Sequence, residues 1–294
     1  MTQVIAALVA RGVVKVSRIS QDSLRTRAAA GSGSFRREAT LRRLLDEARA
    51  QVEAVKRPAD EAPTNAARKT AAQERAARAR GARIEAALAV LPELQAIKEH
   101  HTGKPSQQRE PRVSTTDPEA RRMKLGRGAI APAYNVQFGA DTASRAIVGL
   151  DVTNSGSDQS QSESLRQQVE RRTGRKVKDH LFDGGFVKKE LIDRAESSGV
   201  AIYAPLPTGK DGQPCTQGRG DPPGVRAWRQ RMTTPEAQEI YKERAATIET
   251  VNAETKTYRG LSRLLVRGLN KVRCVALWSA LAYNVVHFAS VLTV

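Results

Sequence analysis

The sequence predicts an α/β protein in which helices flank a mixed β-sheet, with a helical segment inserted after the first strand. Three observations lead to this prediction. Short segments that alternate apolar and polar residues, and are rich in β-branched side chains, recur along the chain and are typical of strands. Segments with the apolar spacing of helices separate them. One stretch, residues 36–99, has the composition of helices alone and interrupts this alternation.

The first predicted strand is at residues 13–20, after one or two helical turns near the N-terminus. It leads directly into Gln21, Asp22 and Ser23, so we expect Asp22 at the carboxyl end of that strand. Ligands of α/β sheets gather at such carboxyl ends. A turn aspartate without a chemical role is the alternative.

The inserted stretch is rich in Ala, Arg, Glu and Gln, and it predicts two helices, at about 37–57 and 66–99, broken by Pro58 and Pro63. An apolar stripe on each helix favours an antiparallel hairpin with a basic outer face. Its arginines could contact a DNA backbone, and a solvated insertion is the alternative. The predicted parts of the chain are the first part of the main domain at 1–35, a helical insertion with a polar linker at 36–118, and the remainder of the main domain at 119–294.

The elements predicted after the linker are strands at 133–140, 146–153, 176–182 and 200–204, and helices at 162–173, at 188–198 and from about 234 onward. Asp183 follows the third of these strands and precedes Gly184 and Gly185, where glycine permits a sharp turn and close approach of a ligand. The final stretch, 274–294, has no Asp, Glu, Lys or Arg and is long enough to span a bilayer. Its polar interruptions favour a core-packing helix instead.

The composition favours a polyanionic partner. The chain has 49 Lys and Arg against 31 Asp and Glu, a formal net charge of +18, and nucleic acid is the usual partner of such an excess. Aromatic residues make up only 4%, which argues against a stacking platform for single strands. Cys215 and Cys274 form no CxxC pair and the four histidines form no ligand pattern, so zinc and histidine metal sites are disfavoured. The apolar N-terminal run lacks the basic leader of a signal peptide.

Residues 241–256 predict one long amphipathic helix, with a start signal in the preceding Thr-Pro pair. On an ideal helix, Glu249 and Lys256 lie about 20° apart, and Tyr241 lies about 80° from Glu249. The same geometry turns Arg244 about 140° away from Glu249. A carboxylate, an ammonium and a phenol on one face could bind a metal ion and a phosphate. A solvated helix with ordinary surface charges is the alternative.

Glu249 would act together with the two aspartates that follow predicted strands, Asp22 and Asp183. Two aspartates at the carboxyl ends of strands and a glutamate on a helix would form a small cluster of hard oxygen ligands. Such a cluster suits Mg²⁺ or Mn²⁺.

Six segments also carry a resemblance to a known family. They are QDSLRTRAAAG at 21–31, PAYNVQFGAD at 132–141, GLDVTNSGSDQSQ at 149–161, LFDGGF at 181–186, YKERAATIETVNAETK at 241–256 and RGLNKVRCVALWSALAYNVVHF at 267–288. In this order they resemble insertion-sequence transposases of the DDE type, whose catalytic domain is RNase H-like. The fifth segment resembles the Tyr, Arg, Glu and Lys signature of the family's last catalytic helix.

The resemblance implies two sets of site residues. The catalytic carboxylates, which would hold two Mg²⁺ or Mn²⁺ ions for DNA phosphodiester cleavage and strand transfer, are Asp22, Asp183 and Glu249. The residues implied to contact DNA phosphates near the scissile bond are Tyr241, Arg244 and Lys256. The implied partners are double-stranded DNA, at the element ends and the target, and a second copy of the chain. The implied location is on DNA in a bacterial cytoplasm, with no membrane.

The chain departs from the family in three ways, one of which is that Phe186 stands where relatives often have Tyr. It begins about a dozen residues before the first predicted strand, so the helical DNA-binding region found upstream in relatives is expected to be missing. Four residues separate Arg244 from Glu249, where three are usual in the family. Two other functions therefore stay open: a non-catalytic nucleic-acid-binding protein, and a truncated transposase that no longer acts.

Overall fold

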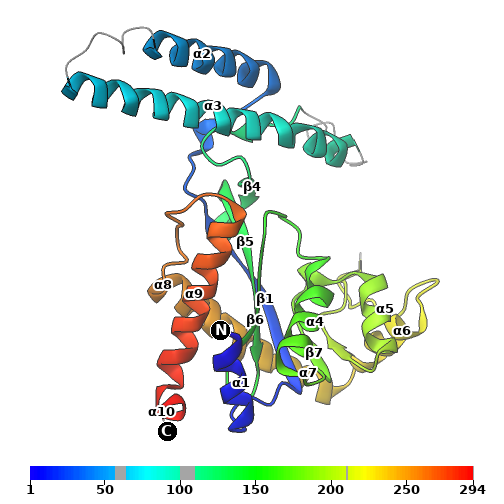
Figure 1. Cartoon of the computed structure of the whole chain (residues 1–294). Coiled ribbons are helices and arrows are strands. Elements are labelled where there is room, and N and C mark those ends of the chain that lie inside the picture. The colour runs from blue at the N-terminus through cyan, green and yellow to red at the C-terminus, as the bar shows by residue number, and fades with distance from the viewer. Residues whose placement is uncertain (57–63, 100–109, 210, 294) are drawn as a thin grey trace. The chain divides into compact units, whose positions relative to one another are not determined.

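The computed structural model describes residues 1–56, 64–99, 110–209 and 211–293 (Figure 1). The fold is mixed α/β, with a curled mixed sheet flanked by helices, and is consistent with the RNase H-like fold expected from the sequence. The chain forms two compact units. Unit 1 comprises Met1–Thr26, Tyr134–Leu264 and Asn270–Val294, and unit 2 comprises Arg27–Ala133 and Leu265–Leu269.

The described strands form one six-stranded sheet and one two-stranded sheet. The larger sheet consists of β1 (Arg18–Arg27), β4 (Arg121–Lys124), β5 (Ile130–Asp141), β6 (Ile147–Thr153), β7 (Asp179–Leu181) and β8 (Ala201–Tyr203). Its order is β4-β5-β1-β7-β8, and β6 also pairs with β5. β7 is parallel to β1 and to β8, whereas β6 is antiparallel to β5. β1 is therefore an interior strand, between β5 and β7.

β1 begins later than the sequence predicted. The prediction placed the strand at 13–20 with Asp22 beyond its end, whereas β1 spans Arg18–Arg27 and contains Asp22. The chain bends before β1, because Val16 has a φ of 62° and its N–H donates to Asp141 Oδ1 at 2.8 Å. Val14 and Val16 are fully buried. The predicted strand therefore overlaps β1 only at residues 18–20, and the valines before it are buried in the core without strand pairing.

The helices of unit 1 pack against this sheet. They are α1 (Thr2–Ala10), α4 (Gln161–Thr173), α5 (Lys189–Ser197), α6 (Pro223–Arg231), α7 (Pro235–Arg244), α8 (Thr250–Tyr258), α9 (Leu269–His287, whose first residue belongs to unit 2) and α10 (Ala289–Leu292). The sequence analysis did not predict α6, which begins with Pro223 directly after a Gly/Pro-rich loop. α4 packs closely on β6, because a Cβ at Gly149 would lie only 2.7 Å from Val169 Cγ2. Trp228 of α6 is fully buried in the core of unit 1.

α9 and α10 occupy the stretch predicted as a core-packing helix. Asn284 of α9 donates to the Ile147 carbonyl at 2.8 Å and accepts from the Ile147 N–H at 2.9 Å, which attaches the helix to β6. Ala276 and Ala280 are buried, whereas the side of α9 that carries Trp278 is exposed. Among the described residues, we find no helix with the length and apolarity that crossing a membrane requires.

Unit 2 contains the predicted helical hairpin, formed by α2 (Glu38–Lys56) and α3 (Thr64–Glu99) (Figure 1). Leu41 and Ile84 are buried in the core between these helices. The small sheet pairs β2 (Phe35–Arg36) with β3 (Val113–Ser114). The prolines that were predicted to break the helices, the first part of the predicted linker at 100–109, and two of the four histidines lie outside the described residues.

Candidate active site

Two of the predicted site carboxylates meet on one arginine in unit 1. Asp22 lies in β1, Arg244 is the last residue of α7, and Glu249 ends the π-helical turn η5 (Ala245–Glu249). Arg244 Nη1 is 3.7 Å from Asp22 Oδ2, and Arg244 Nη2 donates to Glu249 Oε1 at 3.1 Å. The Asp22 and Arg244 side chains are 18% and 14% exposed, whereas Glu249 is 57% exposed. One guanidinium thus bridges two carboxylates that are far apart in the sequence.

The π turn explains why Arg244 reaches Glu249. The ideal-helix geometry used above turned Arg244 away from Glu249, and this expectation was wrong because the helix is not ideal at this point. The hydrogen bonds of a π turn join residues five apart, so the turn is wider than an α-turn and brings Arg244 and Glu249, which are five residues apart, onto neighbouring positions of the helix surface. The residue that the chain has in excess of the family spacing is therefore absorbed locally. α7 and α8 continue on either side of the turn as regular helices.

Asp183 lies two residues after β7, the strand that pairs with β1 in parallel. It caps the short 3-10 turn η4 (Gly184–Phe186), because its Oδ1 accepts from the Gly185 N–H at 2.9 Å. A Cβ at Gly185 would lie 3.0 Å from this Oδ1 and 3.9 Å from Asp158 Oδ2. Glycine at this position therefore leaves the space next to the Asp183 and Asp158 carboxylates free of a side chain.

The Asp22 carboxyl lies in a partly buried, negatively charged environment. The pKa of Asp22 is raised from its usual value of 3.8 to about 6, first by burial and then by the negative charges of Asp183 and Asp158. The Ser23 N–H, which donates to Asp22 Oδ1 at 2.7 Å, and Arg244 oppose the rise. Asp22 is thus a partly buried carboxyl in a locally acidic environment.

Asp158, in the loop before α4, is a site residue that the sequence analysis missed. Its Oδ1 accepts from Asn135 Nδ2 and Gln137 Nε2, both at 2.7 Å, and its Oδ2 accepts from Ser23 Oγ at 3.1 Å and Arg25 Nη2 at 2.9 Å. The four donors come from β5 and β1, and both oxygens of the carboxylate are occupied. Asn135 and Gln137 were the available signal, since two amides on one face of a buried strand need an acceptor.

Of the three residues predicted to contact DNA, two lie in the cluster around Asp22 and the third is not paired with the described residues of that cluster. Arg244 Cζ lies 5.9 Å from the centre of the Tyr241 ring, and burial raises the pKa of Tyr241 above its usual value. Lys256 is exposed on α8, four residues after Asn252. Within the described part of the chain, no hydrogen bond or ion pair joins the Lys256 side chain to Asp22, Arg244 or Glu249. The structure thus brings Tyr241 to Arg244, and does not bring Lys256 into contact with the described residues of the cluster.

The donors near Asp22 suit a divalent cation, although the cluster is not arranged as a finished metal centre. Among the described residues, no group of three or more His, Cys, Asp or Glu is placed to hold a metal ion. Glu249 is instead paired with Arg244. The fit lies in the chemistry: Asp22 and Asp183 offer hard oxygens, and Asn252 adds a buried Oδ1 that has no hydrogen-bond partner. A cation would relieve the repulsion that raises the pKa of Asp22.

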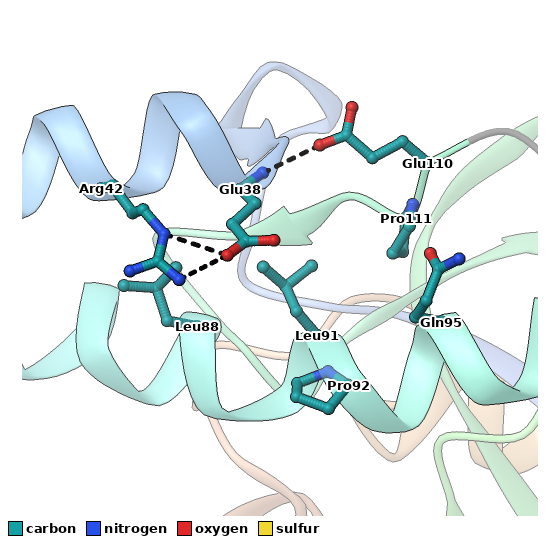
Figure 2. A pocket seen from close by; sticks show the side chains of 8 residues that line it. All are labelled: Glu38, Arg42, Leu88, Leu91, Pro92, Gln95, Glu110 and Pro111. Atoms are coloured by element: carbon teal, nitrogen blue, oxygen red, sulfur yellow. Dashed lines mark hydrogen bonds and ion pairs between the residues drawn. The ribbon is translucent and has the colours of Figure 1, made fainter.

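Unit 2 contains a separate pocket of about 300 Å³ (Figure 2). Leu88, Leu91 and Pro92 of α3 form one wall, and the charged groups opposite them are already paired. Arg42 donates to Glu38 Oε1 at 3.0 and 2.6 Å, and Glu110 Oε1 accepts from the Glu38 N–H at 3.2 Å. We therefore place the candidate active site in unit 1 and not in this pocket.

Comparison with known proteins points to the same unit. Residues 224–289 match a family model described as "Transposase DDE domain". The match supports a DDE-type transposase. The matched residues include η5 and α8, and therefore Arg244, Glu249 and Asn252. No curated protein and no solved structure matches the chain.

Proposed function

We propose that the protein is a transposase that cleaves DNA phosphodiester bonds and transfers the strands when an insertion sequence moves. The observation that carries the proposal is the Arg244 bridge between Asp22 and Glu249, with Asp183 close enough to raise the pKa of Asp22. The helical part of this cluster lies in the segment that matches the DDE family. The net charge of +18 suits a DNA substrate.

In this proposal the catalytic carboxylates are Asp22, Asp183 and Glu249, which would hold two Mg²⁺ or Mn²⁺ ions. When bound, such ions would activate a water molecule or a DNA 3′-hydroxyl and stabilise the leaving oxygen. Asp22 must be ionised to act as a ligand, and its pKa of about 6 means that it is mostly ionised at neutral pH. Glu249 is the most exposed of the contacting side chains, so it is free to turn from Arg244 toward the aspartates.

The proposed DNA contacts are Arg244, Tyr241 and Lys256. The guanidinium of Arg244 has a fork of donors that fits a phosphate as well as a carboxylate, so a DNA phosphate would replace one of its present partners. The ring of Tyr241 would pack against the guanidinium of Arg244 and hold it in position. Lys256, exposed on α8, would bind a phosphate at the edge of the site.

The proposed organisation follows the same division as the sequence prediction. Residues 1–35 and 119–294 would form the catalytic domain, and 36–118 would be an insertion whose arginines contact the DNA backbone. The insertion lies within the range of unit 2. We further propose that the protein acts as a homodimer on double-stranded DNA in the cytoplasm.

A second candidate is a DNA-binding protein without catalytic activity. One observation favours it: Glu249 pairs with Arg244, and no three acidic side chains among the described residues are placed around one metal position. In that case Arg244 would be a permanent structural partner of Asp22 and Glu249.

The two candidates differ in the nicking of duplex DNA with Mn²⁺, compared with EDTA. We expect nicking by the wild type, and a loss of at least about 100-fold in Asp22→Asn, Asp183→Asn and Glu249→Gln with DNA binding retained. Glu236→Gln, in the first turn of α7, is the matched control and should keep full activity. A variant that nicks like the wild type would remove its residue from the site. DNA binding without metal-dependent nicking by the wild type would favour the second candidate.

A further inference from the structure

Asn252 connects the last catalytic helix to the first strand. It lies in α8, three residues after Glu249, so the two side chains share a helix face. Its Nδ2 donates to Asp22 Oδ2 at 3.1 Å. This hydrogen bond joins residues 230 positions apart in the sequence. It links α8 directly to the Asp22 carboxylate in β1.

The other end of the same amide has no partner. Asn252 Oδ1 is buried and accepts no hydrogen bond from any residue that the structure describes. A buried polar atom without a partner costs about 1–3 kcal/mol, so such an atom calls for a physical reason. Arg244 Nη1, which faces Asp22 Oδ2, is also buried and has no hydrogen-bond partner. The surroundings of Asp22 are therefore incompletely satisfied on two sides.

A divalent cation would provide a partner for an amide oxygen of Asn252 beside Asp22. Rotation of the Asn252 amide by a half turn exchanges Nδ2 and Oδ1, which have nearly the same shape. The exchange would place Oδ1 against Asp22 Oδ2, and two oxygens that only accept hydrogen bonds repel each other. A cation between them turns that repulsion into shared ligation, and amide oxygens are accepted ligands of hard cations.

We propose that Asn252 supplies an amide oxygen to the divalent cation held by Asp22, and that its present hydrogen bond keeps Asp22 in place until the cation binds. The inference rests on the proposed metal-dependent function. Asn252 is not among the site residues predicted from the sequence. With it, α8 would contribute a metal ligand even while Glu249 stays paired with Arg244.

The test measures Mn²⁺ binding to the full chain without DNA, by the electron paramagnetic resonance signal of free Mn²⁺. The difference in bound Mn²⁺ between the wild type and Asp22→Asn is taken as the Mn²⁺ bound at the proposed site. We expect Asn252→Ala to weaken this binding at least about tenfold. Asn252→Asp, which supplies an oxygen but no N–H donor, should bind Mn²⁺ as tightly as the wild type or more tightly. Asn270→Ala, a matched change at an exposed position of α9, should leave binding unchanged.

The Asn252→Asp variant separates ligation from simple positioning. If Asn252→Asp loses Mn²⁺ affinity at least as much as the alanine variant, an oxygen at this position does not bind the cation and the proposal fails. Wild-type affinity in Asn252→Ala would also overturn it. If Asp22→Asn binds as much Mn²⁺ as the wild type, the proposed metal site itself fails, which is a different result. Far-UV circular dichroism of each variant establishes that it is folded.

Discussion

Charged side chains pair at exposed positions in the helical hairpin of unit 2, whereas in the candidate site of unit 1 a mostly buried arginine pairs with an aspartate far away in the sequence. In the hairpin, Arg42 and Arg78 each pair with a glutamate four residues away, and these arginines are 69% and 60% exposed. In the site, Arg244 contacts Asp22 on a different element, and both side chains are mostly buried. Exposed local pairs contribute little to stability, whereas buried long-range pairs depend on the whole fold and are costly to break. Four predictions test this difference.

The largest effect is expected from deletions in the helix that carries the site. Deletion of Ala246 removes one residue from the π turn, so the turn can become a regular α-turn and keep Arg244 and Glu249 on one face. Deletion of Ala253, another exposed alanine, rotates the rest of α8 by about 100° and moves the buried Thr255 out of place. We expect nicking within about tenfold of the wild type in the first variant and a loss beyond about 100-fold in the second. Equal damage by both deletions would show that the π turn is not a local insertion.

The second prediction concerns the carboxylate of Asp158. Asp158→Asn places an NH₂ group against donors that now face an oxygen, so two of its four partners lose their acceptor. We expect a loss of about 3 kcal/mol in the free energy of unfolding of unit 1. Denaturant titration followed by tryptophan fluorescence measures it, because both tryptophans lie in unit 1. Asp151→Asn, whose partner Arg273 is 46% exposed, is the matched control and should cost less than about 1 kcal/mol.

The third prediction concerns the pH dependence of stability that Asp22 causes. Its folded pKa is raised from 3.8 to about 6, so the folded state holds this proton longer than the unfolded state does. The stabilisation is complete below about pH 4 and is lost as pH rises through 6. The free energy of unfolding of the wild type should fall by about 2 kcal/mol relative to Asp22→Asn across this interval. A parallel pH profile for the two proteins, measured in EDTA, would contradict it.

The smallest effect is expected at the surface of the hairpin. Arg49 and Glu85 pair across α2 and α3 at 3.0 Å, but their side chains are 64% and 54% exposed. Glu85→Gln should change the free energy of unfolding by less than about 0.5 kcal/mol, and added salt should abolish even that difference. Thermal unfolding followed by circular dichroism at low and high salt measures the change. A cost above about 1 kcal/mol would remove the distinction between the two regions.

The elements that the sequence predicts correctly are those with a local pattern. The helices of the hairpin, the β5–β6 pair, α4, α5 and the glycines after Asp183 follow from periodicity and turn residues, and the structure contains them. Prediction was least successful at β1, where buried valines imitated a strand, and at α6, which follows a Gly/Pro-rich loop. The roles of Asp22, Asp183, Glu249, Tyr241, Arg244 and Lys256 are still predictions.

The sequence by itself determined the α/β class, the positive charge and the family resemblance, because periodicity, composition and short motifs are properties of neighbouring residues. Only the tertiary structure decided that Arg244 reaches Glu249, since the π turn changes the helical period by one residue. It also decided that Asp158 joins β1 to β5 and that Asn252 reaches Asp22. The Asp158 and Asn252 contacts join residues from separate elements, and their geometry is fixed by the packing of those elements and by no pattern within any one of them.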